Sequence, residues 1–174
     1  MNEILIENWN KIVQGGDHVY ILGDFAWKNH ARYIHVLKGK KYLIVGSHDR
    51  MHQECLRLFT EVHPGLLIRN FNGTQFNLSH CAPLVWEKSH YGSISLYAHS
   101  HGRITEHDDR RRMDVGVDIH AYRPISLEFI LFIMQKRAYG IKGGGDEVQK
   151  NVILLQERNK KLLEEFNAQT SQKV

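Results

Sequence analysis

Apolar residues recur at two different spacings along the chain, and together these spacings predict an α/β domain. Short apolar runs predict strands at 18–22, 41–45, 66–70, 74–79, 94–98 and 114–118. Helical spacing predicts helices over 2–14, 29–38, 51–60 and 126–137. Ser126 is the predicted N-cap of the last of these. Strands that alternate with helices are typical of α/β folds.

A glycine run at 143–145 separates this pattern from a polar stretch with a narrow apolar seam at 146–168. The seam alternates steps of four and three residues and consists of Val148, Val152, Leu155, Asn159, Leu162 and Phe166. Such a heptad pattern is typical of a short two-stranded coiled coil. We therefore expect a domain at 1–140, a linker and helix at 141–174, and a homodimer through the 146–168 helix. Packing of that helix back onto its own domain is the alternative.

The amino-acid composition argues against a disordered, a membrane-spanning and a secreted protein. Hydrophobic residues make up 42% and charged residues 24% of the 174 residues, which argues against an intrinsically disordered chain. Its apolar runs are far shorter than the ~20 residues of a membrane span, and the N-terminus lacks signal-peptide features. Two cysteines outside any CxxC motif suit a reducing compartment. We expect a cytoplasmic protein without a membrane partner.

The formal charge of +4 is concentrated in short basic runs at 38–41, 110–112 and 136–137. Such runs favour phosphate-bearing partners, including nucleic acid. Solvated loop and helix ends are the simpler interpretation, and the sequence leaves both open. Twelve histidines against two cysteines indicate that a metal site would use imidazole and carboxylate rather than thiolate.

Acidic or imidazole side chains directly follow several predicted strands. The stretches, which share this design, read GD at 23–24, GSHD at 46–49, SH at 79–80 and AHSH at 98–101. Strand ends of α/β sheets are where ligand sites assemble, because several loops converge there. Neutral imidazole combined with carboxylate suits Zn, Mn or Fe. The pattern therefore predicts a transition-metal site at the strand ends.

This ordered set resembles the GD, GNHD, H and GHxH motifs of the calcineurin-like metallophosphoesterases. The segments 79–86, 114–118 and 122–126 are similar to a small bacterial and phage branch of that family, and the resemblance covers about residues 1–138. It implies two facing mixed β-sheets flanked by helices, here with a C-terminal helical extension. It also implies two metal ions that activate a hydroxide and clamp a phosphate.

The resemblance also implies a role for each matching residue. Asp24 corresponds to the carboxylate that bridges both metals, His80 and His99 to ligands of the second metal, and His101 to a ligand of the first. His48 corresponds to the histidine that protonates the leaving oxygen. Asp49 corresponds to the group that orients this histidine.

Two departures from the family pattern weaken the metal sites, one at each metal. The family's opening DxH motif precedes the first helix, whereas this sequence begins at Met1 inside that helix. Ser47 replaces an asparagine ligand of the second metal, and its hydroxyl is a weaker ligand. Three protein ligands with water can hold an ion, but two rarely do. We therefore expect one divalent transition metal (Mn, Zn or Fe) rather than two.

One DxH string does occur, at 118–120. Its position between Gly116 and Pro124 predicts a structural strand and turn rather than a ligand set. The strand expected upstream of the first helix would leave its neighbours unpaired if absent. The sheet could then close up, another chain could fill the gap, or the sequence could belong to a longer protein.

The sequence thus favours a metal-dependent phosphoesterase that hydrolyses a phosphodiester or a phosphomonoester, with activity weakened by the incomplete first site. The alternative is a catalytically inactive protein of the same fold that acts through protein or nucleic-acid contacts.

Overall fold

The computed structural model describes residues 2–104 and 110–137. The chain divides into two units, Met1–Gly140 and Ile141–Val174, and the described residues all belong to the first. The predicted helix at 146–168, and with it the homodimer prediction, lies outside the described residues. In chain order, the elements are α1 (Asn2–Ile12), β1 (His18–Ile21), α2 (His30–Val36), β2 (Lys40–Ile44), α3 (Gln53–Leu56), β3 (Glu61–His63), β4 (Leu66–Phe71), β5 (Thr74–Ser79), β6 (Ile94–Tyr97), β7 (Arg112–Asp114) and α4 (Leu127–Met134).

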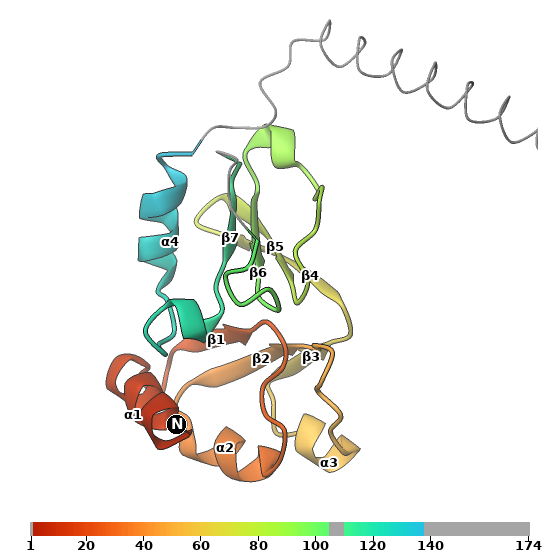
Figure 1. Cartoon of the computed structure of the whole chain (residues 1–174), viewed down its shortest axis with the longest axis vertical. Helices are drawn as coiled ribbons and strands as arrows, with labels where there is room; N and C mark the ends of the chain where they lie inside the picture. The colour runs from red at the N-terminus through yellow and green to blue at the C-terminus, as the bar shows by residue number, and fades with distance from the viewer. Residues whose placement is uncertain (1, 105–109, 138–174) are drawn as a thin grey trace, which may run out of the picture. The chain divides into compact units, whose positions relative to one another are not determined.

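The described strands form two sheets, which confirms the α/β class with two sheets (Figure 1). The first sheet has the order β1-β2-β3, and both of its strand pairs are parallel. The second has the order β4-β5-β6-β7 and is mixed, because only β4 and β5 pair antiparallel. The prediction that both sheets are mixed is therefore wrong for the first. Helices α2 and α3 connect its strands, and such crossovers return the chain in the same direction.

The hairpin between β4 and β5 turns on Asn72 and Gly73. Both residues have positive φ angles, of 50° and 78°. Two consecutive positive φ angles are typical of the type I′ turn, whose twist matches that of two antiparallel strands. This turn fixes the register in which Leu67 faces Leu78 and thereby sets where β5 ends.

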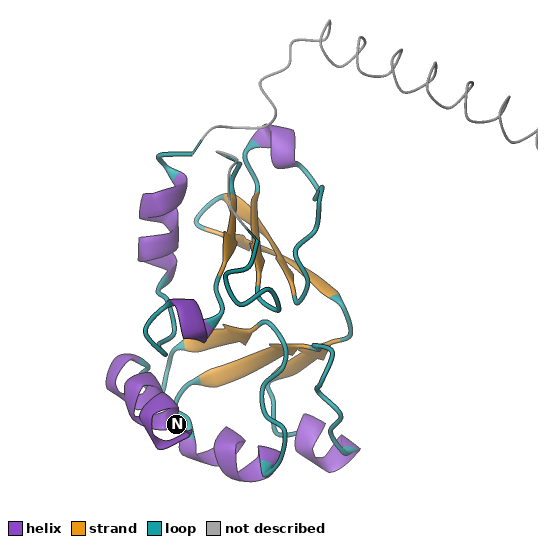
Figure 2. Ribbon diagram, in the orientation of Figure 1, coloured by secondary structure: helices purple, strands orange, loops and turns teal. Residues whose placement is uncertain are grey.

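Strand β2 is buried on both of its faces. Leu43 packs in a core cluster with Ile34 of α2 and with Phe59, whereas Ile44 belongs to the main core. In Figure 2, α1, α2 and α3 lie on the side of the three-stranded sheet that faces away from the four-stranded sheet. Burial on both faces explains why the apolar run in this strand is continuous rather than alternating.

The main core joins side chains from both sheets and from α4. Its buried members are Leu22, Ile44, Leu67, Phe76, Leu78, Ile94, Leu96, Met113, Ile130 and Met134. Leu22 and Ile44 come from the ends of β1 and β2, so the core lies directly beneath the predicted site residues that follow those strands. Fixing the strand ends in a close-packed core restricts the motion of the loops that begin there.

The helix predicted at 51–60 is much shorter than expected, since α3 covers only Gln53–Leu56. The amide of Thr60 donates to the carbonyl of Lys41 at 2.8 Å, which draws the chain alongside β2. The following residues form β3, a strand that the periodicity did not predict. Phe59 becomes buried in this arrangement, and the burial of its ring outweighs the local helical preference.

The strand predicted at 114–118 is also misplaced, because β7 covers Arg112–Asp114. The Asp114 carboxylate accepts a hydrogen bond from the amide of Gly116 at 2.8 Å, and this turn ends the strand. Residues Val117–Ile119 then form a single 3₁₀ turn. The only DxH string of the sequence therefore lies partly in a turn.

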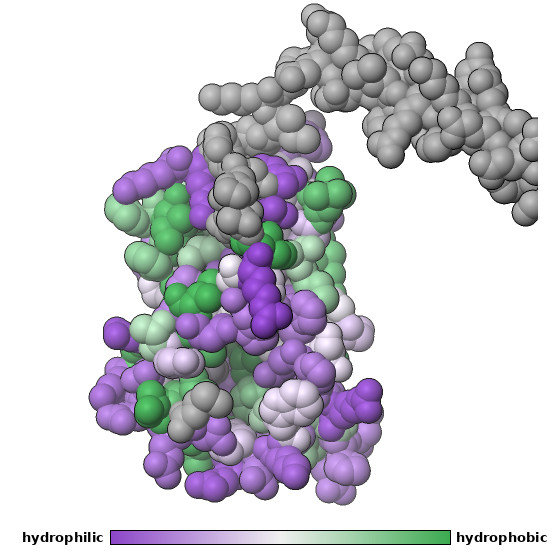
Figure 3. Space-filling model, in the orientation of Figure 1, coloured by the Kyte–Doolittle hydropathy of each residue, from purple (hydrophilic) through white to green (hydrophobic). Residues whose placement is uncertain are grey.

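Helix α4 begins as predicted, with the Ser126 hydroxyl accepting a hydrogen bond from the amide of Phe129 at 3.2 Å. Ile130 and Met134 face the main core, while Phe129 and Phe132 are about half exposed, at 49% and 54%. Apolar surface is visible over this helix in Figure 3. In the described part of the chain, we find no helix with the length and hydrophobicity needed to cross a membrane.

Two glycines let the ends of β1 and β2 approach each other closely. A Cβ atom on Gly23 would lie 2.5 Å from the Gly46 Cα atom and 2.5 Å from the His80 Nδ1 atom. A Cβ atom on Gly46 would lie 2.5 Å from the Asp24 amide nitrogen and 2.6 Å from its Oδ1 atom. Side chains larger than hydrogen are therefore excluded where the predicted site residues begin.

We expect the Gly46→Ala substitution to lower the free energy of unfolding by about 1–3 kcal/mol, the usual cost of overpacking. Gly65→Ala is the matched control, because a Cβ atom there would meet nothing within 4 Å. Neither glycine has a positive φ angle, so the comparison isolates the steric effect. The control should change stability by no more than about 0.5 kcal/mol in urea unfolding. Equal effects of the two substitutions would contradict the proposed close approach.

Candidate metal centre

His80 follows the end of β5 and is buried, with 6% of its surface exposed. Its Nδ1 atom lies 2.7 Å from the carbonyl oxygen of Leu22, at the end of β1 in the other sheet. A carbonyl oxygen can only accept a hydrogen bond, so Nδ1 carries a proton. The Nε2 atom of the neutral ring therefore presents its lone pair, the form in which histidine binds a metal.

Two further predicted ligands lie close to this Nε2 atom. The Nδ1 atom of His99, after β6, is 3.0 Å away, and the two rings meet edge to face at an angle of 72°. The Oδ2 atom of Asp24, after β1, is 3.4 Å away. The structure thus brings Asp24, His80 and His99 together from three strand ends.

The backbone around these residues adopts an uncommon conformation. Asp24, His99 and His101 have φ angles of 54°, 59° and 49°, in the left-handed region that non-glycine residues rarely occupy. Each such residue costs on the order of 1–3 kcal/mol and persists only where its surroundings hold it. Conformations of this kind are enriched at functional sites, and here they occur at three of the predicted ligands.

Asp49 holds the ends of β1 and β2 together. Its carboxylate accepts hydrogen bonds from the backbone amides of Asp24, Phe25 and Gly46, each at 2.8 Å. The sequence predicted that Asp49 orients the His48 ring, but its hydrogen bonds in the structure go to these amides instead. Asp49 thus fixes the loop that carries His48 rather than binding its ring.

Asp114 plays the corresponding part in the second sheet, a role that the sequence did not reveal. Its buried carboxylate accepts hydrogen bonds from the Ser100 hydroxyl at 2.6 Å and the Gly102 amide at 3.2 Å, both in the loop after β6. It also binds the Gly116 amide after β7. The loop that presents His99 and His101 is therefore attached to the neighbouring strand end.

His48 and Ser47 are exposed in the loop after β2. The His48 amide donates to the Asp24 Oδ1 atom at 2.8 Å, which links this loop to a predicted metal ligand. The His48 ring lies against the Trp27 ring, with 4.4 Å between the ring centroids. Trp27 is 77% exposed and was missed by the sequence analysis, which attached no chemistry to it.

The side chain of His101 contacts Asp118 rather than another predicted ligand. Its Nδ1 atom is 2.5 Å from the Oδ2 atom of Asp118, the aspartate of the DxH string. Its side chain is 63% exposed. Asp118 binds the Nδ1 atom, so a metal ion at the predicted first site would have to use the Nε2 atom of His101.

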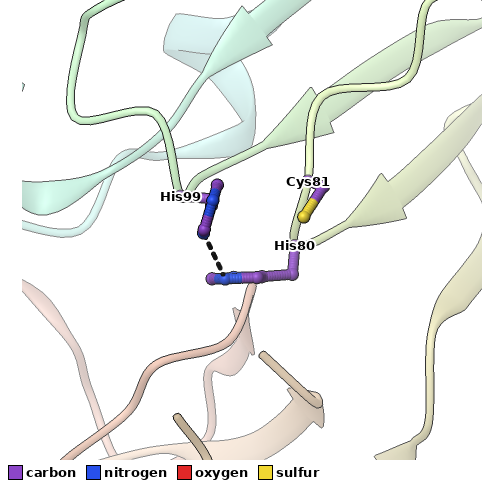
Figure 4. A group of neighbouring side chains, drawn as sticks. All are labelled: His80, Cys81 and His99. Carbon is purple, nitrogen blue, oxygen red and sulfur yellow. Dashed lines mark hydrogen bonds between the residues drawn. The ribbon is translucent and has the colours of Figure 1, made fainter. Parts of the chain in front are cut away.

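Cys81 is a further residue that the sequence analysis missed. Among the described residues, His80, Cys81 and His99 could hold a metal ion, because their ligand atoms all lie within 4.8 Å of one another (Figure 4). The sequence predicted imidazole and carboxylate ligands rather than thiolate, whereas the Cys81 sulfur lies close to both histidines. A cysteine directly after a predicted histidine ligand is the signal that could have found it.

Two known proteins that this chain resembles are themselves described as uncharacterized or of unknown function. No family model matches the chain. It is similar to an uncharacterized protein of Methanocaldococcus jannaschii, with 28% identity over 146 residues that cover 78% of this chain and 76% of that relative. It is also similar to the crystal structure of a protein of unknown function from Aquifex aeolicus, with a TM-score of 0.61 and 22% identity over 75% of this chain and 83% of that one. The second likeness shows that the two chains share a fold.

Proposed function

We propose that the chain is a metal-dependent phosphoesterase whose two sheets pack face to face, as in the calcineurin-like metallophosphoesterases. The observation that carries this proposal is the position of two predicted ligands beside the His80 Nε2 atom. The His99 Nδ1 atom lies 3.0 Å from it and the Asp24 Oδ2 atom 3.4 Å from it. The core that contains side chains of both sheets supports the facing arrangement.

These residues fit a divalent transition metal. The hydrogen bond from the His80 ring to the Leu22 carbonyl leaves Nε2 available and fixes the ring orientation, as supporting groups of metal sites do. Two imidazoles and one carboxylate suit Zn, Mn or Fe and leave a coordination position for water or substrate. When bound, such an ion would polarise the phosphate ester and lower the pKa of a water molecule.

His48 is the residue that we assign to proton transfer to the leaving oxygen. Imidazole can give and take a proton near neutral pH, which general acid catalysis requires. The loop of His48 is attached to Asp24 through the His48 amide, so this loop lies beside a proposed ligand of the ion. Its exposure leaves it accessible to a phosphate-ester substrate.

A single ion is the expected occupancy. Asp24, His80 and His99 form one ligand set. The hydrogen bond of the His101 Nδ1 atom to Asp118, at 2.5 Å, leaves only the His101 Nε2 atom for a second site. Asp24 and His101 alone would be two protein ligands, which is too few to hold an ion tightly.

The alternative, an inactive protein that binds nucleic acid through its basic runs, has less support. Lys41, Arg111 and Arg112 belong to these runs and are buried, with at most 8% of each residue exposed. The Lys41 ammonium donates to the carbonyls of Leu37 and Gly39, and burial lowers its pKa. These three buried cations leave fewer basic side chains of the runs, among them the exposed Lys38 and Lys40, to neutralise phosphates of a bound strand.

We expect the purified full chain to retain about one Mn or Zn ion after exchange into metal-free buffer. Elemental analysis should show that His80→Ala and His99→Ala each lose this ion, because each removes a ligand from the same set. His101→Ala should retain it. Two ions in both the wild type and His101→Ala would contradict the single-ion assignment.

We expect His48→Ala to lower the rate of Mn-dependent hydrolysis of an aryl phosphodiester by roughly 10²–10⁴-fold, the usual range for general acid catalysis. Metal content should stay unchanged, since His48 is not assigned as a ligand. His90→Ala, an exposed histidine in the 3₁₀ turn Ser89–Tyr91, is the matched control and should keep the wild-type rate.

Two outcomes would argue against these roles. A His48→Ala protein that loses its metal and regains the wild-type rate when metal is restored would make His48 a ligand. A wild-type protein that holds its ion but hydrolyses neither phosphodiesters nor phosphomonoesters would favour the inactive binding protein.

A further inference from the structure

The sulfur of Cys81 lies next to the two histidines of the proposed metal centre. The ligand atoms of His80, Cys81 and His99 are all within 4.8 Å of one another. Figure 4 shows the sulfur and the His99 ring on the same side of the His80 ring. Cys81 is exposed and forms no disulfide, so its thiol is accessible to a ligand from solvent.

The backbone explains how two successive side chains come to lie together. Neighbouring residues of a strand point to opposite faces, but β5 ends at Ser79, and the chain bends at His80 and Cys81. The Ser79 hydroxyl donates to the Cys81 carbonyl at 2.9 Å and holds this bend. The contact uses only the backbone of Cys81, so the thiol itself is left for another partner.

We propose that the Cys81 thiolate is an additional ligand of the ion held by His80 and His99, and that it makes the site selective for thiophilic ions such as zinc and cobalt over manganese and magnesium. This inference rests on the metal centre proposed above. In a tetrahedral site, zinc lies about 2.3 Å from sulfur and about 2.0–2.1 Å from nitrogen, which separates S and N by roughly 3.5 Å. Rotation of the exposed Cys81 side chain can close the remaining gap.

Binding exchanges one bond for another at the sulfur. The S–H bond breaks, its proton passes to solvent, and the sulfur lone pair forms the bond to the metal, so no oxidant or reductant is needed. Thiolate is a soft ligand that zinc accepts readily, whereas manganese and magnesium favour carboxylate, carbonyl and water oxygens.

The additional ligand changes what the site can do. Asp24, His80, Cys81 and His99 together would supply four protein ligands, the closed set typical of structural zinc sites. Without the thiolate, three protein ligands leave a position open for water or substrate. Zinc would therefore bind tightly and close the site, whereas manganese would leave Cys81 unused and the site open.

Cobalt titration of the full chain tests this inference. We expect Co²⁺ to give visible d–d bands together with a near-ultraviolet band from sulfur-to-cobalt charge transfer. Cys81→Ser should lose the near-ultraviolet band and keep the visible bands. Cys55→Ser is the matched control, because it removes the other free cysteine of the chain, in α3, and should keep both sets of bands.

Affinity provides a second measurement on the same proteins. Cys81→Ser should weaken zinc binding by at least roughly tenfold, since losing even a supporting residue of a metal site costs about that much. Its manganese affinity should stay within twofold of the wild type. A Cys81→Ala protein should behave in the same way, which separates the loss of sulfur from any effect of the serine hydroxyl.

The possible failures are distinguishable. A near-ultraviolet band that persists in Cys81→Ser, or an equal loss of zinc and manganese affinity, would overturn the role of Cys81 and leave the metal centre intact. Visible bands without any near-ultraviolet band in the wild type would do the same. Absence of all cobalt bands in the wild type would overturn the metal centre itself and, with it, this inference.

Discussion

A hydrogen bond of 2.7 Å between the His80 Nδ1 atom and the Leu22 carbonyl joins the end of β5 in one sheet to the end of β1 in the other. It forms only because Gly23 has no side chain, since a Cβ atom there would lie 2.5 Å from the same nitrogen. The bond sets the direction of a buried ring and places the proton on Nδ1 when the ring is neutral. Its Nε2 atom then points to the place where Asp24 and His99 lie nearby.

Two carboxylates stabilise the loops on either side of this bond. Asp49 binds amides after β1 and β2, and Asp114 binds groups after β6 and β7. A buried or half-buried carboxylate that accepts several backbone donors satisfies polar groups that the ends of strands would otherwise leave unpaired. Each sheet thus uses one aspartate to hold together two parallel strand ends, β1 and β2 in the first sheet and β6 and β7 in the second.

These supports also account for the left-handed backbone at Asp24 and His99. Such conformations are unfavourable by themselves and need surroundings that over-determine them. At Asp24 the surroundings are the Asp49 carboxylate and the amide of His48, and at His99 they are the loop contacts of Asp114. Packing and hydrogen bonding in this fold thus hold Asp24 and His99 beside the His80 Nε2 atom, the kind of support expected of a ligand-binding centre.

The sequence by itself determined most of the strands and the polar residues that follow them. Apolar runs predicted β1, β2, β4, β5 and β6, and a serine before an apolar stretch predicted the Ser126 cap, because both signals are local properties of the chain. It failed for the helix at 51–60 and the strand at 114–118, where pairing with β2 and the Asp114 turn prevail. Only the tertiary structure decided that His101 binds Asp118 while Cys81 lies beside His80 and His99. These contacts depend on how separate strand ends and bends are placed in space, and no local pattern of residues specifies that.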